Sequence, residues 1–156
     1  MMNVILAVKG EQAMVGMIIT GHGNFASGLL SALKLLLGEP PLVWAVDFSE
    51  DQSTDELKEN LLKAVSHSEE SILILADIKG CSPDNQSLLI KSELKERNIE
   101  VVSGTNLPML ILGALERKDK TVEEVAKQVL VNGKAGIDQF ILKTNLQTIS
   151  DRDDGI

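Results

Sequence analysis

Ile72-Leu73-Ile74-Leu75-Ala76 is a stretch with an apolar side chain at every position. A strand that helices cover on both faces of a parallel sheet has this pattern, whereas a half-exposed strand alternates apolar and polar residues. Three other short β-type runs lie along the chain, and the segments between them have the longer spacing of helices. This alternation predicts an α/β fold with a doubly wound, mainly parallel sheet, in which residues 72–76 form a central strand.

The predicted elements follow from the apolar runs, the helix-start residues and the stops that contain glycine, proline or asparagine. Strands are expected at Val15–Thr20, Leu42–Asp47, Ser71–Asp77 and Ile99–Ser103. Helices are expected near Asn24–Leu37, Thr54–Ser66, Asp84–Asn98, Met109–Arg117 and Val122–Asn132. Thr121, with Glu124 three residues later, predicts a capping box that opens the last helix, and Gly133 predicts its end.

The two ends of the chain depart from this regular pattern. Residues 1–13 contain a short apolar piece and then a polar one, and we interpret them as a non-native or disordered extension; the alternative is an additional edge strand. Residues 14–142 are expected to form one domain, in which Gly136–Leu142 is a final short strand. Residues 143–156 are expected to be a polar, frayed tail.

The composition excludes several classes of protein. The chain has 156 residues, 44% of them hydrophobic and 24% charged, which is ordinary for a folded domain. Its net charge of -8 argues against sequence-independent binding of nucleic acid, because that binding requires a basic surface. The single cysteine, Cys81, excludes an intramolecular disulfide and the usual zinc spacings, and it agrees with a reducing cytoplasm. No apolar run reaches the length of about 18 residues that spans a bilayer.

The residues that follow the predicted strands are the candidates for a functional site. The ends of parallel strands meet at one edge of the sheet, where α/β proteins bind their ligands. His22, which stands between two glycines, follows the first strand, Asp77 ends the third, and Gly104-Thr105-Asn106 follows the fourth. If the first and third strands are neighbours, a crevice opens between His22 and Asp77.

A histidine beside a carboxylate is a recurring chemical unit. The carboxylate accepts one ring N–H, fixes the tautomer and leaves the other nitrogen with a lone pair for attack. The Ser82 hydroxyl and the amides of residues 80–82 are candidate donors to a phosphoryl group on that nitrogen, and the helix after His22 offers its first amides. Structural alternatives stay open: His22 inside a satisfied turn, Asp77 as a turn cap and Ser82 as a helix cap.

Two further residues bear on the chemistry. Cys81 beside His22 and Asp77 would imitate the site of a cysteine hydrolase, although a lone cysteine is more often a small packing residue. His67 precedes the third strand, so we expect it at the opposite edge of the sheet as a solvated residue at a helix end. The two histidines therefore do not form a metal pair.

In order and context, these turns resemble those of the IIA domain of the mannose family of the bacterial phosphoenolpyruvate-dependent sugar phosphotransferase system. The resemblance covers about residues 14–142. It lies in three motifs, Ile18-Ile19-Thr20-Gly21-His22-Gly23, Asp77-Ile78-Lys79-Gly80-Cys81-Ser82-Pro83 and Gly104-Thr105-Asn106-Leu107-Pro108-Met109-Leu110. The set is specific, although no single motif is. Cys81 departs from the pattern, because the family usually has a glycine at this place.

The resemblance implies roles for particular residues. The histidine of the family's first motif carries the phosphoryl group, which implies this role for His22, with Asp77 as its hydrogen-bonding partner and Ser82 as the small hydroxyl residue. The backbone of the phosphoryl pocket is expected to come from Gly23, Gly80, Cys81 and Asn106.

The resemblance also implies a reaction and an assembly. The phosphoryl donor would be phosphorylated HPr, and the acceptor would be a IIB protein or domain that feeds sugar entering through membrane IIC and IID components. No metal, nucleotide or other cofactor is expected. The protein would be cytoplasmic and transiently at the inner face of the membrane. The family is a homodimer with strand order 2-1-3-4, to which the other subunit adds an antiparallel C-terminal strand; Gly136–Leu142 is the matching piece here.

Two other functions stay open. The phosphocarrier subunit of a dihydroxyacetone kinase also uses a histidine after the first strand, but it passes phosphate to a kinase-bound nucleotide. A regulatory module would be phosphorylated on His22 to signal sugar availability without feeding a transporter. The sugar itself cannot be named, because a IIA component contacts proteins and not the sugar.

Overall fold

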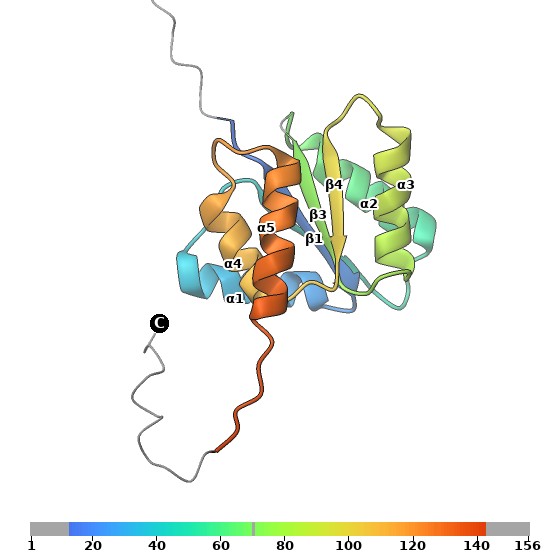
Figure 1. The fold of residues 1–156 in the computed structure, drawn as a ribbon. Helices are drawn as coiled ribbons and strands as arrows, with labels where there is room; N and C mark the ends of the chain where they lie inside the picture. The colour runs from blue at the N-terminus through green and yellow to red at the C-terminus, as the bar shows by residue number, and fades with distance from the viewer. Residues whose placement is uncertain (1–12, 70, 143–156) are drawn as a thin grey trace, which may run out of the picture.

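The computed structural model describes residues 13–69 and 71–142. Strands and helices alternate along most of this part of the chain (Figure 1). The strands are β1 (Gly16–His22), β2 (Val43–Phe48), β3 (Ile72–Ala76) and β4 (Ile99–Ser103). The helices are α1 (Phe25–Leu37), α2 (Thr54–Ser66), α3 (Ser82–Glu93), α4 (Leu107–Glu116) and α5 (Val122–Ala135).

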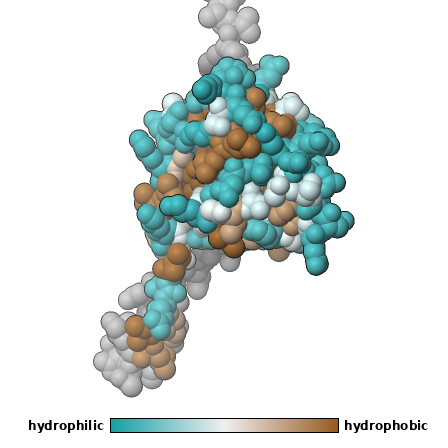
Figure 2. Space-filling view, turned by 90° about the vertical axis from the view of Figure 1, so that its right-hand side faces the viewer, coloured by the Kyte–Doolittle hydropathy of each residue, from teal (hydrophilic) through white to brown (hydrophobic). Residues whose placement is uncertain are grey.

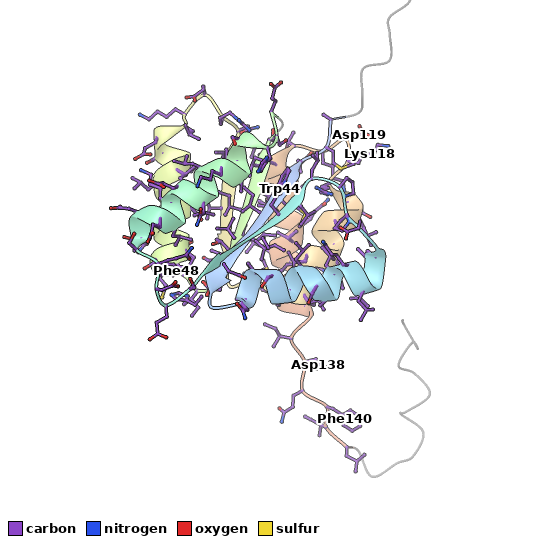
Figure 3. All side chains as sticks on the ribbon, turned by 180° about the vertical axis from the view of Figure 1, so that it is seen from behind. Trp44, Phe48, Lys118, Asp119, Asp138 and Phe140 are labelled. Atoms are coloured by element: carbon purple, nitrogen blue, oxygen red, sulfur yellow. The ribbon has the colours of Figure 1, made fainter. Side chains whose placement is uncertain are left out.

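The sheet has the order β2-β1-β3-β4, and all of its pairings are parallel. Helices α1, α4 and α5 cover one face, and α2 and α3 cover the other (Figure 1). The prediction of a doubly wound parallel α/β sheet with this strand order is therefore confirmed. In Figure 1 the β4 edge faces the viewer, and Figure 3 shows the β2 edge from behind.

The apolar stretch of β3 lies at the centre of both cores. Its five residues are all 0% exposed. Leu73 and Leu75 belong to the core under α1, α4 and α5, whereas Ile72 and Ile74 belong to the core under α2 and α3. Successive side chains of a strand point to opposite faces, so a strand between two cores has to be apolar at every position.

Most predicted boundaries agree with the structure to within a few residues. Ser53 with Glu56 and Thr121 with Glu124 form capping boxes, each with both reciprocal hydrogen bonds, so the two predicted helix starts are confirmed.

The prediction of a helix to Asn98 is wrong, because α3 ends at Glu93. Leu94 has non-helical dihedral angles, and the chain turns there with the Arg97 amide donating to the Leu94 carbonyl. The Arg97 guanidinium donates to the Ser68 carbonyl at 2.7 Å, which ties this turn to the end of α2.

Gly133 does not end the last helix, as the sequence predicted, but lies inside α5. A Cβ at this position would collide with the Met109 side chain. The glycine therefore serves the close approach of α5 to α4 and not a helix stop.

The predicted final strand is not present within the single chain. Gly136 caps α5, and residues 137–142 have no strand assignment and run away from the body of the protein (Figure 1). Ile137 is 75% exposed and Leu142 is 74% exposed. A strand that pairs with a second subunit stays a prediction, because one chain cannot test it. Of the predicted extension, residues 1–13, only residue 13 is described, and the predicted tail, residues 143–156, lies outside the described residues.

Arg117 lies buried at the end of the sheet opposite the candidate site. Its side chain is 1% exposed and lies beside the starts of β1 and β2. Nη1 donates to the carbonyls of Val15 at 2.8 Å and Leu42 at 3.1 Å, and Nη2 donates to the carbonyl of Pro41. Burial lowers the pKa of Arg117 to about 10, so the guanidinium is still charged at neutral pH.

No helix within the described ranges is both long and apolar enough to cross a membrane. On the side of the protein where α3 lies, hydrophobic side chains form a band between hydrophilic ones (Figure 2). Helix α3 itself carries two exposed leucines, Leu88 at 47% and Leu89 at 41%.

Candidate functional site

The carboxyl ends of the parallel strands bring three turns together at one edge of the sheet. His22 is the last residue of β1, and Asp77 directly follows β3. The Asp77 amide donates to the Thr20 carbonyl at 3.1 Å, and the Gly104 amide donates to the Asp77 carbonyl at 3.1 Å. These bonds hold the end of β3 between β1 and the turn after β4.

His22 and Asp77 form two hydrogen bonds with each other. Oδ2 of Asp77 lies 2.7 Å from the ring Nδ1 of His22 and accepts the backbone amide of the same residue at 2.8 Å. The other carboxylate oxygen, Oδ1, accepts the Ile78 amide at 2.8 Å. Since Nδ1 is engaged, Nε2 is the ring nitrogen that remains for another partner.

The two partners differ in their exposure. The His22 side chain is 47% exposed, and the Asp77 side chain is 7% exposed. Burial by itself raises the pKa of Asp77, but the hydrogen bonds from the His22 amide, the His22 ring and the Ile78 amide outweigh it, and the pKa is lowered. An ionised Asp77 is thus held beneath a ring that large partners can reach.

Gly21 permits this approach of β1 to Asp77. It is buried in β1, and a Cβ at this position would lie 2.9 Å from both Cβ and Cγ of Asp77. Atoms do not approach so closely without displacement. A glycine before the histidine is therefore required by the His22–Asp77 geometry.

Three of the four predicted pocket amides are engaged inside the protein. The Gly23 amide donates to the Phe48 carbonyl at 2.8 Å, and the Cys81 amide donates to the Ile78 carbonyl at 3.3 Å. The Gly80 amide donates to the Asp84 carboxylate at 2.8 Å. In this structure the turns use these three amides to hold their own shape, and a phosphoryl pocket lined by this backbone stays a prediction.

The turn before α3 is held by residues of α3 itself. Gly80 has φ of 82°, a left-handed conformation that glycine adopts readily. Asp84 accepts the Gly80 amide, and the Asn85 side chain donates to the Gly80 carbonyl at 3.0 Å. Both peptide groups of Gly80 are thus bound, which fixes the path of the chain into Cys81 and Ser82.

A carboxylate also lies at the start of α1. Oδ1 of Asp47, near the end of β2, accepts the Ser27 amide in the first turn of α1 at 2.9 Å. A negative charge at this end of a helix is favourable. Of the first amides of α1, which the sequence predicts as donors to an anion, the one of Ser27 is bound by Asp47.

The remaining predicted residues lie on the same edge. Cys81 is the N-cap residue of α3 and is partly exposed, and Ser82 is the first residue of that helix. Asn106 is the N-cap residue of α4; its Oδ1 accepts the Met109 amide at 3.2 Å, and its Nδ2 donates to the Gly133 carbonyl at 2.9 Å. The Asn106 side chain thus joins α4 to α5.

His67 is not part of this edge. It is an exposed residue at the C-cap of α2, as predicted, and its ring stacks on Trp44 with centroids 6.0 Å apart. Among the described residues, no group of three or more histidine, cysteine, aspartate or glutamate side chains is arranged to hold a metal ion.

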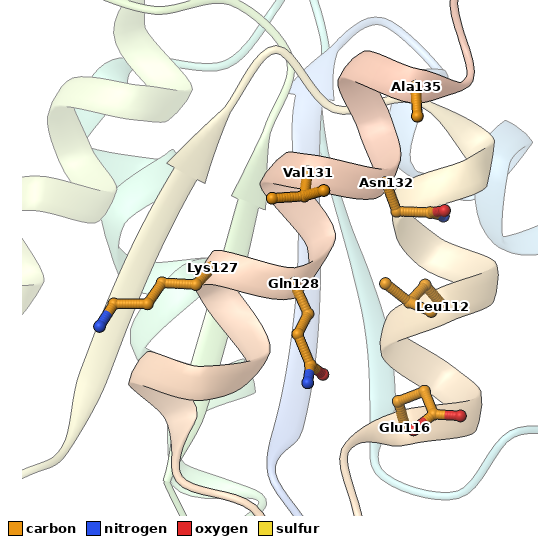
Figure 4. Close-up of a pocket in the computed structure, with 7 residues that line it drawn as sticks. All are labelled: Leu112, Glu116, Lys127, Gln128, Val131, Asn132 and Ala135. Carbon is orange, nitrogen blue, oxygen red and sulfur yellow. The ribbon is translucent and has the colours of Figure 1, made fainter.

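A hollow of about 430 Å³ lies between α4 and α5 and contains none of the candidate residues (Figure 4). It is lined by Leu112, Glu116, Lys127, Gln128, Val131, Asn132 and Ala135. This lining lacks a histidine–carboxylate pair or a thiol, so the chemistry of the protein is to be sought at the His22 edge.

Comparison with known proteins identifies the family. A family model described as EIIA-man, PTS system fructose IIA component, matches residues 16–130. The chain belongs to the EIIA-man family. The EIIA component of Streptococcus agalactiae has a solved structure that is 32% identical and superposes with a TM-score of 0.77, over 81% of this chain and 97% of that one. A mannose/sorbose-specific IIA subunit from Enterococcus faecalis, 23% identical over 83% of this chain and 97% of that one, shares the fold with a TM-score of 0.76.

Curated relatives of this EIIA-man chain also match it over most of its length. The sorbose-specific EIIA component of Lacticaseibacillus casei is 26% identical over 72% of this chain and 81% of its own length. The mannose-specific EIIAB component of Escherichia coli K12 is 29% identical over 79% of this chain. The chain spans only 38% of the length of that protein.

The structure adds three residues to the candidate site of this EIIA-man chain that the sequence interpretation did not assign to it. They are Asp47, which binds the start of α1; Phe48, whose ring contacts His22; and Asp84, which binds Gly80. Asp47 and Phe48 end β2, and the rule that strand ends converge at one edge applies to that strand too. Asp84 had no comparable signal, because an acidic residue in a first helical turn usually serves the helix alone.

Proposed function

We propose that this chain is a phosphocarrier of the sugar phosphotransferase system, which accepts a phosphoryl group on His22 from phosphorylated HPr and gives it to a IIB protein or domain. One observation carries the proposal: a half-exposed imidazole, bound through Nδ1 to a buried carboxylate, stands at an open edge of the sheet. Two successive protein partners can approach such an edge, whereas a closed pocket would admit neither.

The proposed transfer uses Nε2 of His22. Nδ1 carries the proton that Asp77 accepts, so Nε2 has a lone pair that attacks the phosphorus of the donor's phosphohistidine. The new Nε2–P bond forms as the N–P bond of the donor breaks, and the donor histidine takes the released electron pair. The ring then carries positive charge, which the ionised Asp77 stabilises.

The second transfer reverses these roles. A nucleophilic side chain of the IIB partner attacks the phosphorus, the Nε2–P bond breaks, and its electron pair returns to the His22 ring. Imidazole serves in both steps, because it is a nucleophile as the free base and a leaving group once phosphorylated. The residues of this chain supply position and charge, and the scheme needs no metal or nucleotide.

We place the phosphoryl oxygens beside Ser82 at the start of α3. The amides of Gly23, Gly80 and Cys81 are bound elsewhere, and the Ser82 hydroxyl and amide are the predicted donors that this proposal uses. A helix N-terminus favours a negative group. In this scheme Cys81 is only a backbone residue of the turn, and its thiol takes no part in the transfer.

We also propose a homodimer in which residues 137–142 of each chain add an antiparallel strand to the other. Large apolar side chains are 56–75% exposed on this segment, which is unfavourable in a lone chain; they are Ile137, Phe140, Ile141 and Leu142. The protein would act in the cytoplasm, with the IIC and IID components of a transporter downstream of its IIB partner.

Intact mass measurement tests the proposed function. The purified protein is incubated with phosphoenolpyruvate, Enzyme I and HPr, and a second reaction omits HPr. We expect one acid-labile phosphoryl group that depends on HPr, is absent in His22→Ala and is retained in His67→Ala. Failure of the wild-type protein to gain mass would contradict the proposal, and equal labelling of both variants would contradict the assignment to His22.

A further inference from the structure

Phe48 lies against the imidazole of His22 at the end of β2. The two ring centroids are 5.7 Å apart, and the ring planes are inclined by 61°, which is an edge-to-face arrangement. Aromatic rings attract each other in this geometry. Phe48 thus contacts the same ring that Asp77 holds through Nδ1.

The backbone fixes Phe48 and His22 relative to each other. The two residues are direct partners in the parallel register of β1 and β2. The Phe48 carbonyl also accepts the amide of Gly23, the residue after the histidine, at 2.8 Å. The contact between the rings is therefore set by the sheet and does not depend on a mobile loop.

Phe48 is also anchored away from the site. Its half-buried ring packs against the core beneath α2 and α3, together with the ring of Trp44 at the other end of the strand (Figure 3). A side chain that is held both by the core and by the strand register forms a rigid support for its neighbour.

The hydrogen bond to Asp77 does not by itself prevent rotation of the imidazole ring. It holds Nδ1 at a point, but the ring can still swing about that point and change the direction of Nε2. A ring packed against the imidazole restricts this swing. Small errors in the direction of a nucleophile are expensive, because a displacement of about 1 Å lowers rates by about a hundredfold.

We infer that Phe48 is a positioning residue, which sets the direction of Nε2 of His22 and thereby the rate of phosphoryl transfer. The effect on the transfer rate rests on the proposed function. The claim that Phe48 orients the His22 ring does not depend on that function. Asp77 fixes the tautomer, and Phe48 fixes the orientation.

The molecule offers a matched control on the same strand. Trp44 also lies on β2 and packs against the same core. Among the ring contacts of the described residues, Trp44 stacks on His67 and not on His22. Replacing Trp44 by leucine removes a comparable amount of apolar contact or more. Any effect that arises only from weakening β2 appears in Trp44→Leu as well.

The experiment compares Phe48→Leu, Phe48→Tyr and Trp44→Leu with the wild-type protein. Single-turnover phosphorylation is followed at increasing concentrations of phosphorylated HPr. For Phe48→Leu we expect the maximal rate to fall about tenfold, and the half-saturating concentration to change less than about twofold. Phe48→Tyr, which keeps the ring, restores the rate, and Trp44→Leu retains it.

Nitrogen NMR of the histidine rings supplies a readout that is independent of transfer. In Phe48→Leu we expect the His22 ring signals to shift or broaden, while those of His67 stay in place; Trp44→Leu gives the converse. A maximal rate within about twofold of the wild type in Phe48→Leu, or equal losses in both leucine variants, would overturn the inference. If the wild-type protein accepts no phosphoryl group, the proposed function fails, and the NMR comparison still decides whether Phe48 orients the ring.

Discussion

Asp77 holds His22 at two points with a single oxygen: Oδ2 accepts both the ring Nδ1–H, at 2.7 Å, and the backbone amide, at 2.8 Å. The carboxylate therefore fixes the side chain of the histidine and the turn that carries it at the same time. Asparagine could accept only weaker hydrogen bonds at this place, and it could not balance a positive ring.

Asp77→Asn should lower the rate of phosphorylation of His22 on the order of a hundredfold or more, because the ring loses both its fixed tautomer and its counter-charge. Rapid mixing with phosphorylated HPr measures this rate. Asp51→Asn is the control, since Asp51 lies on an exposed loop and its side chain binds Ser49. A rate for Asp77→Asn equal to that of the control would show that the carboxylate has no part in transfer.

The lowered pKa of Asp77 predicts a dependence of stability on pH. The stability contributed by the ionised carboxylate is fully present above the pKa of an unfolded aspartate, about 4, and is lost as the pH falls through the lower pKa of the folded state. Between these values the urea midpoint of the wild-type protein should fall more steeply than that of Asp77→Asn. Parallel curves for the two proteins would count against the hydrogen bonds as the cause.

Gly21→Ala should reduce phosphorylation more than tenfold, because the new Cβ would lie 2.9 Å from Asp77 and displace it from His22. Gly28→Ala provides the comparison: no atom outside its own helix lies within 4 Å of a Cβ there, and the residue is inside α1. That variant should gain about 0.5–1 kcal/mol of stability. Phosphorylation rates and thermal midpoints are measured for both variants. A Gly21→Ala variant that is phosphorylated at the wild-type rate would refute the expected effect of the new Cβ.

Arg117→Met should destabilise the protein by about 3 kcal/mol, because it leaves three carbonyl groups without their shared donor. The exposed neighbour Lys118 gives the control variant Lys118→Met, with a change within about 0.5 kcal/mol. Urea denaturation measures both. A loss below about 1 kcal/mol for Arg117→Met would mean that water replaces the guanidinium without penalty.

Removal of residues 137–156 should convert the proposed dimer into a monomer, because the exposed apolar segment after α5 would be lost. Light scattering after size-exclusion chromatography measures the mass of both forms. The replacement of Phe140 and Ile141 by serine is the milder variant and should shift the equilibrium in the same direction. Dimers of unchanged stability in both variants would place the subunit contact elsewhere.

The sheet could be predicted from the sequence because the pattern of β3 depends on local geometry alone. A strand between two cores is apolar at every position, and the chain shows this at residues 72–76. The capping boxes were predictable for the same reason, since each is complete within four residues. The end of α3 was not, because the contact of Arg97 with Ser68 joins residues far apart in the chain.

The approach of His22 to Asp77 was predictable, but the hydrogen bonds of the surrounding turns were not. The rule that strand ends converge brings His22 and Asp77 to one edge. The direction of an amide in a turn depends on dihedral angles and on which acceptor comes within reach, as with Asp84 and Gly80. The contact of Phe48 with His22 arises from strand register, which no local pattern specifies to the residue.

The engagement of the Gly23, Gly80 and Cys81 amides by internal acceptors has a consequence for a carrier. Several amides free to bind a phosphoryl group would hold that group tightly. Here the three amides already have acceptors inside the protein, so they contribute little to the binding of a phosphoryl group. For the proposed carrier, weak binding would preserve the transfer potential of the phosphohistidine, so that the group could move onward almost as readily as it arrived.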